Sequence, residues 1–329
     1  MRKVCEANLA GSFEKASRLL ESLAGLSIGV KRVQLISEGV GRVLVEERDE
    51  ATKVFFAHPP RPSRSAPAVA LMVITADGGR VQTRQDDPAQ KWKEDKVAVV
   101  YPATPSPQRP GVEYQGPSPG PRSVVATMES WEALGNHAST LADRRGYARA
   151  VQKVFISDAA TGVRSVRETC FPDARFVLDW AHAVEHLHVC AVAAFGPGPK
   201  EADWLERQKE RLWNGQLPAV ISEIARLSRR LGPPPKSASE NDPRKIVASN
   251  LEYFRSNRQA MDYPLFRKQG WPLGSGIVES TIKQVGKRMK GTEKHWTIRG
   301  AEQTLQVITH LISQDGAWAD FWRRCPLAA

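Results

Sequence analysis

The sequence predicts an α/β fold in which helices flank a mixed β-sheet. Apolar runs at 68–77, 153–158 and 174–180 are too short for helices and are bounded by turn residues or charges, as is typical of buried strands. Three strands are expected in succession, and the later strands alternate with helices. This order favours a mixed sheet with helices on its faces.

The N-terminal part is predicted to be helical. Residues 12–25 space their apolar side chains at three and four positions and end at Gly25, which indicates an amphipathic helix. A second helix is expected over 30–56. The proline-rich segment 59–67 then marks the first domain boundary.

The first predicted strand, 68–77, reaches a glycine pair at 78–79 that is expected to end it. Residues 80–84 and 96–102 are predicted as the next two strands, so that Asp77 and Gly78 would form a hairpin turn. The segment 102–122 is rich in proline and is expected to be an exposed loop.

Helical patterns fill most of the chain after residue 128, apart from the two strands at 153–158 and 174–180 and a loop at 232–243. The expected helices are 128–151, 182–195, 201–231, 244–260, 277–290 and 298–313.

Composition excludes several classes of protein. The chain has 329 residues, of which 25% are charged and 41% hydrophobic, a globular balance that excludes wholesale disorder, collagen and coiled coils. The net charge of +11 favours a polyanionic partner such as nucleic acid. No apolar run approaches the roughly 20 residues that span a bilayer. Since the start is charged and the four cysteines form no CxxC pair, we expect a soluble cytoplasmic protein without a zinc finger.

Three acidic residues are candidates for a catalytic site. Asp77 and Asp158 end predicted strands, and ligands of such sheets bind at the carboxyl ends of strands. Each also has a structural explanation, Asp77 as a turn residue and Asp158 as a helix N-cap. Glu279 lies in the first turn of a predicted helix, where the macrodipole favours a carboxylate. Each acid can be explained alone, but the combination suggests a shared role.

A basic face follows Glu279 on the same predicted helix. Lys283 and Lys287 come at successive intervals of four residues and share its face, and Arg288 and Lys290 enlarge the patch. An acid followed by cations suits a site where a metal-bound phosphate meets protein. The alternative is a solvated helix with ordinary i,i+4 ion pairs.

The segment DWAHAVEHLH places Asp179, His182 and His186 on one face of a predicted helix. It does not match the HExxH pattern of zinc proteases. We expect Asp179 and His182 to bond each other and to have a structural role beside the site, rather than to form a metal site of their own. Trp296 could stack on a base but is predicted to lie in the core.

The sequence resembles the DDE transposases of bacterial insertion sequences, and most closely the ISKra-type family. The resemblance covers roughly residues 12–312. It is carried by ITADG (74–78), KWKEDKVAVVYP (91–102), VFISDAATGVRSVRETCFPDARFVLDWAHAVEHL (154–187), GWPLGSGIVESTIKQVGKRMKGT (270–292) and HWTIRGAEQTL (295–305).

This resemblance implies an RNase H-like fold with a helical insertion before the last catalytic acid. It implies that Asp77, Asp158 and Glu279 are the catalytic acids, with Asp179 and His182 beside them. Family members usually have a longer N-terminal part, and whether this copy is truncated stays open from the sequence. The domains implied are a helical N-terminal region at 1–58, a catalytic domain at 68–190 and 265–313, a helical insertion at 191–264 and a C-terminal tail at 314–329.

The expected function is metal-dependent cleavage and strand transfer of DNA, with the three acids holding two Mg²⁺ or Mn²⁺ ions. The partners would be transposon ends and target DNA, bound by a homodimer or larger assembly near the nucleoid. The residues expected on backbone phosphates are Lys283, Lys287, Arg288, Lys290 and His295.

Three alternatives stay open from the sequence. A catalytically inactive DNA-binding remnant would bind DNA in a salt-sensitive way without cleaving it. An RNase H-like nuclease, such as a junction resolvase, would cleave DNA without joining ends. A metabolic α/β enzyme would not bind DNA even at low salt.

Overall fold

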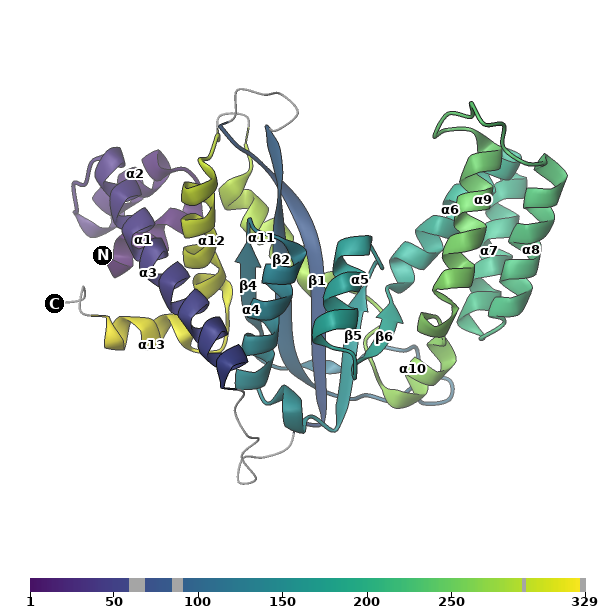
Figure 1. Cartoon of the computed structure of the whole chain (residues 1–329), viewed down its shortest axis with the longest axis horizontal. Helices are drawn as coiled ribbons and strands as arrows, with labels where there is room; N and C mark the ends of the chain where they lie inside the picture. Colours follow the sequence, from purple (N-terminus) through teal and green to yellow (C-terminus); the bar gives the residue numbers. More distant parts are fainter. Residues whose placement is uncertain (59–68, 85–90, 292–293, 326–329) are drawn as a thin grey trace.

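The computed structural model describes residues 1–58, 69–84, 91–291 and 294–325. A six-stranded sheet lies at the centre, with helices on both faces (Figure 1). A bundle of helices extends from one end of the sheet, and the N-terminal helices lie at the other end together with the C-terminus (Figure 1). The predicted linker 59–67 lies outside the described residues.

The sheet is mixed, as predicted. The strands are β1 (Leu71–Gln82), β2 (Trp92–Thr104), β3 (Ser118–Pro119), β4 (Ser123–Thr127), β5 (Gln152–Ser157) and β6 (Arg175–Leu178). Their order is β3-β2-β1-β5-β6, with β4 also paired to β2. β1 and β2 are antiparallel, whereas β1, β5 and β6 are parallel. This α/β arrangement is compatible with the RNase H-like fold that the sequence suggested.

The predicted break at the glycine pair is wrong. β1 continues through Gly78 and Gly79, which pair with Lys96 and Asp95 on β2, so 80–84 is not a separate strand and Asp77 is not a turn residue. A Cβ on Gly79 would lie 2.5 Å from Oδ1 of Asp95. Glycine is therefore needed here because an acidic side chain crosses from the neighbouring strand, and not because the chain turns.

The helices are α1 (Arg2–Ala7), α2 (Phe13–Ala24), α3 (Val30–Ala57), α4 (Trp131–Arg144), α5 (Thr161–Cys170), α6 (Trp180–Phe195), α7 (Pro199–Trp213), α8 (Leu217–Leu231), α9 (Pro243–Ser256), α10 (Tyr263–Gln269), α11 (Gly276–Met289), α12 (Ile298–Ile312) and α13 (Ala317–Arg324). The predicted helix over 12–25 is confirmed. Ser12 caps its start by accepting from the backbone N–H of Lys15, and Gly25 ends it with a φ of 63°. Strands β3 and β4 and helices α1, α10 and α13 were not predicted.

Side chains alternate along β1 and so divide the core into two layers. Even-numbered residues such as Met72 and Ile74 pack beneath α4 and α5. Odd-numbered residues such as Val73 and Val81 face the layer that contains α6, α11 and α12. Asp77 has an odd number, so its side chain lies on the face that α11 covers.

Helices α6–α9 form the bundle, with Trp204, Leu212, Val220 and Phe254 among its buried residues. Helix α6 runs without a break from the end of β6 into this bundle, so the predicted domain boundary at residue 190 lies within a helix. The loop predicted over 102–122 is irregular and mostly exposed between Thr104 and Ser118, but β2 continues to Thr104 and β3 lies within the predicted range.

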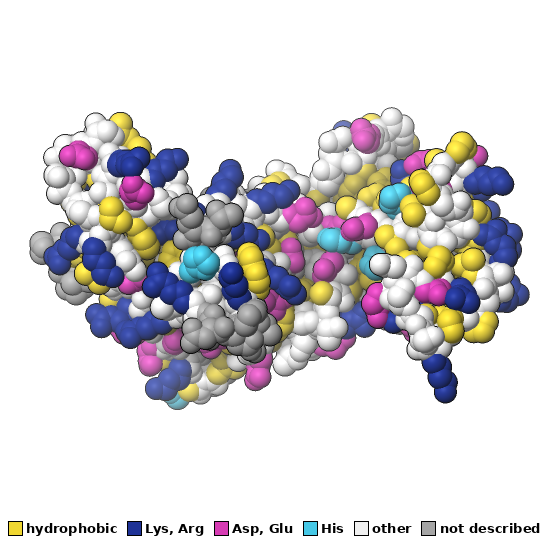
Figure 2. All heavy atoms as spheres, turned by 90° about the horizontal axis from the view of Figure 1, so that it is seen from above, with side chains coloured by type: hydrophobic (Ala, Val, Ile, Leu, Met, Phe, Trp, Pro, Cys, Tyr) yellow, Lys and Arg dark blue, Asp and Glu magenta, His cyan; other side chains and the backbone are white. Residues whose placement is uncertain are grey.

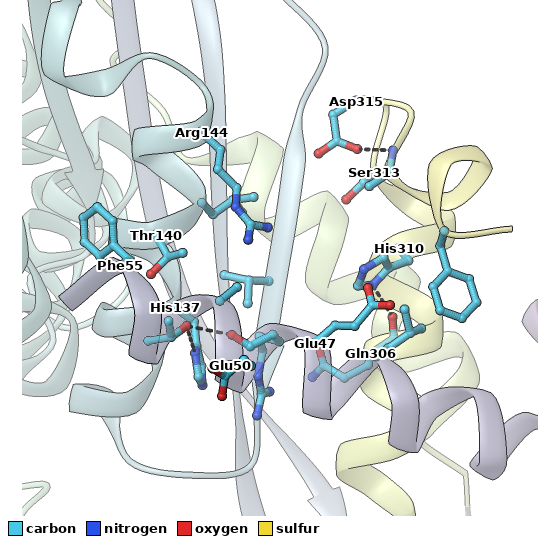
Figure 3. Close-up of a pocket in the computed structure, with 18 of the residues that line it drawn as sticks. Glu47, Glu50, Phe55, His137, Thr140, Arg144, Gln306, His310, Ser313 and Asp315 are labelled. Carbon is cyan, nitrogen blue, oxygen red and sulfur yellow. Dashed lines mark hydrogen bonds between the residues drawn. The ribbon is translucent and has the colours of Figure 1, made fainter. Parts of the chain in front are cut away.

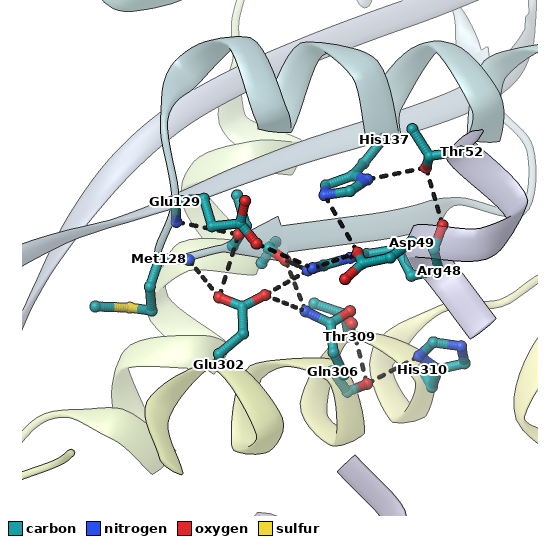
Figure 4. Close-up of polar contacts among 12 residues, drawn as sticks. Arg48, Asp49, Thr52, Met128, Glu129, His137, Glu302, Gln306, Thr309 and His310 are labelled. Atoms are coloured by element: carbon teal, nitrogen blue, oxygen red, sulfur yellow. Dashed lines mark hydrogen bonds and ion pairs between the residues drawn. The ribbon is translucent and has the colours of Figure 1, made fainter. Parts of the chain in front are cut away.

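A polar network joins the N-terminal helices to the sheet (Figure 4). Arg48 of α3 is mostly buried and forms ion pairs with Glu302 of α12, with Asp49 at 2.7 Å and with Glu129 at 3.5 Å. Glu302 in turn accepts from the hydroxyl of Thr127 on β4 at 3.1 Å. The network therefore fixes α3 against α12 and β4. Among the described residues, no helix has both the length and the apolar character needed to cross a membrane.

Candidate active site

Asp77 and Asp158 lie on neighbouring strands. The parallel pairing of β1 and β5 includes Thr75 opposite Ile156. Asp77 lies two residues beyond Thr75 on β1, and Asp158 lies two residues beyond Ile156, directly after the end of β5. Since paired strands are about 4.8 Å apart, the two acids lie at the same end of the β1–β5 pair.

Asp158 lies in a tightly held loop and is not the predicted N-cap. Its Oδ1 accepts from the backbone N–H of Ala160 at 2.9 Å, and Ala160 itself is the N-cap of α5. Between them, Ala159 has a φ of 65°, a left-handed conformation that costs a residue with a Cβ about 1 kcal/mol or more. The surrounding contacts must therefore impose this conformation.

One such contact comes from the helical bundle. The hydroxyl of Tyr253 on α9 donates to the backbone carbonyl of Asp158 at 3.3 Å. The Tyr253 ring stacks on His186 with a centroid separation of 3.6 Å, and Nδ1 of His186 lies 2.5 Å from Oδ1 of Asn250. His186, a member of the predicted histidine cluster, therefore supports Tyr253 instead of facing the acids as a ligand.

Glu279 lies in the first turn of α11, as predicted, and its Oε1 accepts from the hydroxyl of Ser275 at 3.1 Å. The backbone N–H of Ser275 donates to Oδ2 of Asp179. The backbone N–H of Asp179 donates in turn to the carbonyl of Ser157 at 2.9 Å. A continuous path of hydrogen bonds thus links Glu279 to the residue before Asp158.

Asp179 is 1% exposed and joins the N-terminal ends of α6 and α11. Besides its bond to Ser275, its Oδ1 accepts from the backbone N–H of His182 at 3.1 Å and so caps α6. Asp179 and His182 thus bond each other, as predicted, but through the backbone of His182; the His182 ring lies 3.5 Å from Glu185. The supporting position of Asp179 is as expected, whereas its partner is the backbone.

The three acids influence one another electrostatically. The pKa of Asp77 is raised, mainly by burial and further by the charges of Asp158 and Glu279. A hydrogen bond from the backbone N–H of Gly78 at 2.6 Å and the nearby His182 act in the opposite direction. Asp158 and Glu279 are thus near enough for their charges to act on Asp77.

The chemistry of these donors fits Mg²⁺ or Mn²⁺, since carboxylate oxygens are the ligands that hard divalent cations prefer. Within the part of the chain that the structure describes, no group of three or more His, Cys, Asp or Glu side chains is arranged so that it could hold a metal ion. In this structure, Asp77, Asp158 and Glu279 are therefore not arranged as a ready metal site.

The exposed cations of the predicted basic face are Lys283, Lys287, Lys290 and His295. The two lysines on α11 are four residues apart and share one face of the helix. Figure 2 shows acidic and histidine side chains between the sheet and the bundle, with Lys and Arg side chains over much of the surrounding surface. The site is thus an acidic region within a basic surface.

Arg288 does not belong to this surface, so its predicted contact with DNA is wrong for this structure. It is 1% exposed, and its guanidinium lies 4.4 Å from the ring centre of Phe13 and 4.9 Å from that of Trp296. Its Nε donates to Asn8 at 3.0 Å, and burial lowers its pKa to about 10. Trp296 is 7% exposed, which confirms its predicted place in the core.

Sequence reasoning missed Ser275 and Tyr253 as residues that hold the acids in place. Ser275 lies directly before α11, and a serine preceding a helix is a signal that could have suggested a role at its start. Tyr253 carries no such signal, because its relation to Asp158 depends on the packing of α9 against α6.

Comparison with known proteins gives matches among solved structures but none among family models or curated proteins. No protein-family model matches the chain, and no curated protein matches it. Among solved structures, it is similar to a chain of the Drosophila P element transposase strand transfer complex, with a TM-score of 0.37 and 11% sequence identity over 92% of this chain and 96% of that chain.

Proposed function

We propose that this protein is a transposase of the ISKra type, which cleaves and joins DNA strands at an RNase H-like domain through Asp77, Asp158 and Glu279. The observation that supports the proposal concerns the pKa of Asp77 on β1, which is raised mainly by burial and further by the charges of Asp158 and Glu279. These two acids come from the loop after β5 and from the first turn of α11.

In this proposal the three acids hold one or two Mg²⁺ or Mn²⁺ ions. When bound, such ions activate a water molecule or a 3′-hydroxyl and stabilise the leaving oxygen of the scissile phosphate. The protein's own contribution is to fix the carboxylates. Asp179 joins the starts of α6 and α11, and Ser275 orients Glu279.

DNA would lie along the exposed cations near this site. Lys283, Lys287, Lys290 and His295 are the candidates for contacts with backbone phosphates. Such contacts supply affinity that falls as the salt concentration rises, and the net charge of +11 acts in the same direction. Joining two DNA ends calls for an assembly of at least two copies.

The test is nicking of a supercoiled plasmid in the presence of Mg²⁺ or Mn²⁺ by the full chain and by Asp158→Asn. We expect the variant to lose nicking and to keep its DNA affinity. The matched control is Asp203→Asn, the same change at an exposed position on α7, which should nick like the unaltered protein. Equal nicking by Asp158→Asn would contradict the assignment.

The same assay separates the alternatives. Salt-sensitive DNA binding without any metal-dependent cleavage by the unaltered protein would indicate an inactive DNA-binding remnant. Cleavage without transfer of a 3′-end to a second DNA would indicate an RNase H-like nuclease.

A further inference from the structure

The antiparallel ribbon of β1 and β2 extends beyond α4 and α5 at one end of the sheet (Figure 1). Even-numbered residues of β1 up to Ala76 pack beneath these two helices, whereas Arg80 is exposed. The first residues of β2, which pair with this part of β1, are also exposed or half-buried. The ribbon end, defined as residues 80–84 and 92–94, therefore presents side chains to solvent on the face that α4 and α5 cover elsewhere.

Trp92 places a large aromatic ring on this face. Among the nine tryptophans, all of which lie in the described residues, it alone is exposed, at 52%. It pairs directly with Gln82, so its side chain stands on the same face as Arg80, two residues before Gln82. A flat indole in solvent offers a large contact surface to a planar group of a partner.

Cationic and ionisable side chains surround this ring. Arg80 and Arg84 are exposed and share the face, because side chains alternate along a strand. The backbone N–H of Trp296 donates to the carbonyl of Gln82 at 3.0 Å, and Nε of Arg84 donates to the carbonyl of His295 at 3.0 Å. Trp296 belongs to the core on the other face, so the exposed His295 before it lies on the face of Arg84.

The acid on the described part of this face is already paired. Glu94 lies opposite Arg80 in the strand register, but its carboxylate is 3.4 Å from Nζ of Lys96. Lys96 is 7% exposed and lies 5.8 Å from the ring centre of Trp131 on α4. Glu94 thus balances a buried lysine, and Arg80 forms no ion pair with any other residue in the described ranges. The ribbon end therefore presents positive charge around an exposed indole.

The ribbon end differs in this respect from the cavity of about 1120 Å³ between α3, α4, α12 and α13 (Figure 3). The lining of that cavity has six carboxylates and four guanidinium groups, among them Glu47, Glu50 and Arg144. None of the ribbon-end residues lines it. Since an acidic lining repels a polyanion, the ribbon end, and not this cavity, suits nucleic acid.

We propose that the ribbon end binds single-stranded DNA, with an unpaired base stacked on Trp92 and the neighbouring phosphates held by Arg80, Arg84 and His295. Aromatic rings stack on any base, and cations follow the phosphates of the same strand. Bases inside a duplex are already stacked on one another, so Trp92 selects unpaired nucleotides. This inference rests on the proposed function, which makes DNA the substrate.

The ribbon end is separate from the acidic site. Asp77 lies five residues before Gln82 on β1, which is about 17 Å along the strand, and its odd number puts it on the opposite face. A change at Trp92 therefore leaves the carboxylates in place, and DNA binding at the ribbon end can be measured without catalysis.

The test is binding of the full chain to fluorescein-labelled DNA, measured by anisotropy in EDTA so that no metal-dependent cleavage occurs. The two probes are a blunt duplex and the same duplex with a short single-stranded thymidine tail. We expect Trp92→Ala to bind the tailed duplex about tenfold more weakly and the blunt duplex unchanged. Arg80→Gln should also weaken binding of the tailed duplex and reduce its dependence on salt, because a phosphate contact is lost.

Two variants serve as controls. Trp92→Phe keeps an aromatic ring and should keep most of the affinity for the tailed duplex. Phe56→Ala removes another exposed aromatic ring, from the last turn of α3, and should bind both probes like the unaltered protein. Thermal unfolding of each variant would show whether it is folded.

Three results would overturn the inference. The first is normal binding of the tailed duplex by Trp92→Ala, and the second is an equal loss for both probes, since the ring would then not distinguish unpaired bases. The third is a change in oligomeric state of Trp92→Ala with normal DNA binding, which would place a second copy of the chain on the indole.

The result is independent of the test of the acids. Asp158→Asn should bind the tailed duplex like the unaltered protein. If Trp92→Ala shows the expected loss while Asp158→Asn nicks plasmid normally, the ribbon end binds DNA and the proposed catalytic function fails. If Asp158→Asn loses nicking while Trp92→Ala binds the tailed duplex normally, the proposed function stands and the inference about the ribbon end fails.

Discussion

The buried imidazole of His137 should make the protein sensitive to mild acid. Its pKa is about 6.5 in an unfolded chain and about 4 in the folded protein. The unfolded chain therefore binds a proton more tightly than the folded protein does. The stability that depends on a neutral His137 is complete above pH 6.5 and is lost as the pH falls toward 4.

The size of the effect follows from this shift. A fall in the pKa of His137 from about 6.5 to about 4 corresponds to about 3 kcal/mol at the acid limit, and to about 2–3 kcal/mol at pH 4.5. The side chain is 8% exposed, so screening by solvent reduces this little. The substitution His137→Asn removes the titrating group, and its loss of packing is the same at every pH.

The assay is urea denaturation of the unaltered protein and of His137→Asn at pH 7.5 and pH 4.5, at one ionic strength. At pH 7.5 the variant should be less stable. From pH 7.5 to pH 4.5, the free energy of unfolding of the variant relative to the unaltered protein should rise by about 2–3 kcal/mol. A difference that stays the same at both pH values would refute the reasoning.

Three further predictions concern packing around the acidic site and the basic face. Arg288 is buried, so Arg288→Ala should destabilise the fold by about 3 kcal/mol, as measured by thermal unfolding. The adjacent Lys287 is exposed, so Lys287→Ala should lower DNA affinity and leave stability unchanged, as measured by DNA binding at two salt concentrations. The two variants would show the reverse effects if Arg288 faced DNA. Tyr253→Phe should cost about 1 kcal/mol and speed hydrogen exchange of the backbone in the loop after β5, and unchanged exchange would show that the hydroxyl does not hold this loop. Gly79→Ala should cost about 1–3 kcal/mol through contact with Asp95, and the cost should vanish in an Asp95→Ala background; a cost that persisted there would place its cause elsewhere.

Much of the fold could be predicted because its signals are local. The strands β5 and β6 are short apolar runs between polar segments, and α2 has both a serine cap and a terminal glycine. The glycine pair in β1 misled the prediction because glycine marks a turn in most sequences. Here its cause is the Asp95 side chain of β2, and that pairing is invisible in the sequence around residue 79.

The sequence allowed us to predict where candidate residues lie along α11, but not which other side chains they contact. Helical spacing correctly put Glu279 in the first turn of α11 and Lys287 on its exposed face. The same spacing gave no sign that Arg288 is buried, because Phe13, which packs against it, lies far away in the chain. Burial of a charged side chain is decided by such long-range packing, and helical periodicity reports only which residues share a face.

The three acids differ in how firmly the fold holds them. Asp77 lies inside β1, where it pairs with Val97 on one side, and Thr75 two residues earlier pairs with Ile156 on the other. Asp158 instead lies in the loop between β5 and α5, and Glu279 lies in the first turn of α11. The short loop of Asp158 is held by single hydrogen bonds, and Glu279 accepts from one serine. A shift of Asp77 toward the other two acids would break several backbone hydrogen bonds between β1 and its neighbouring strands. A shift of Asp158 or Glu279 would break few hydrogen bonds. Asp77 is therefore expected to move least of the three acids. The contacts that orient Asp158 and Glu279 then decide whether all three carboxylates can bind the same metal ions.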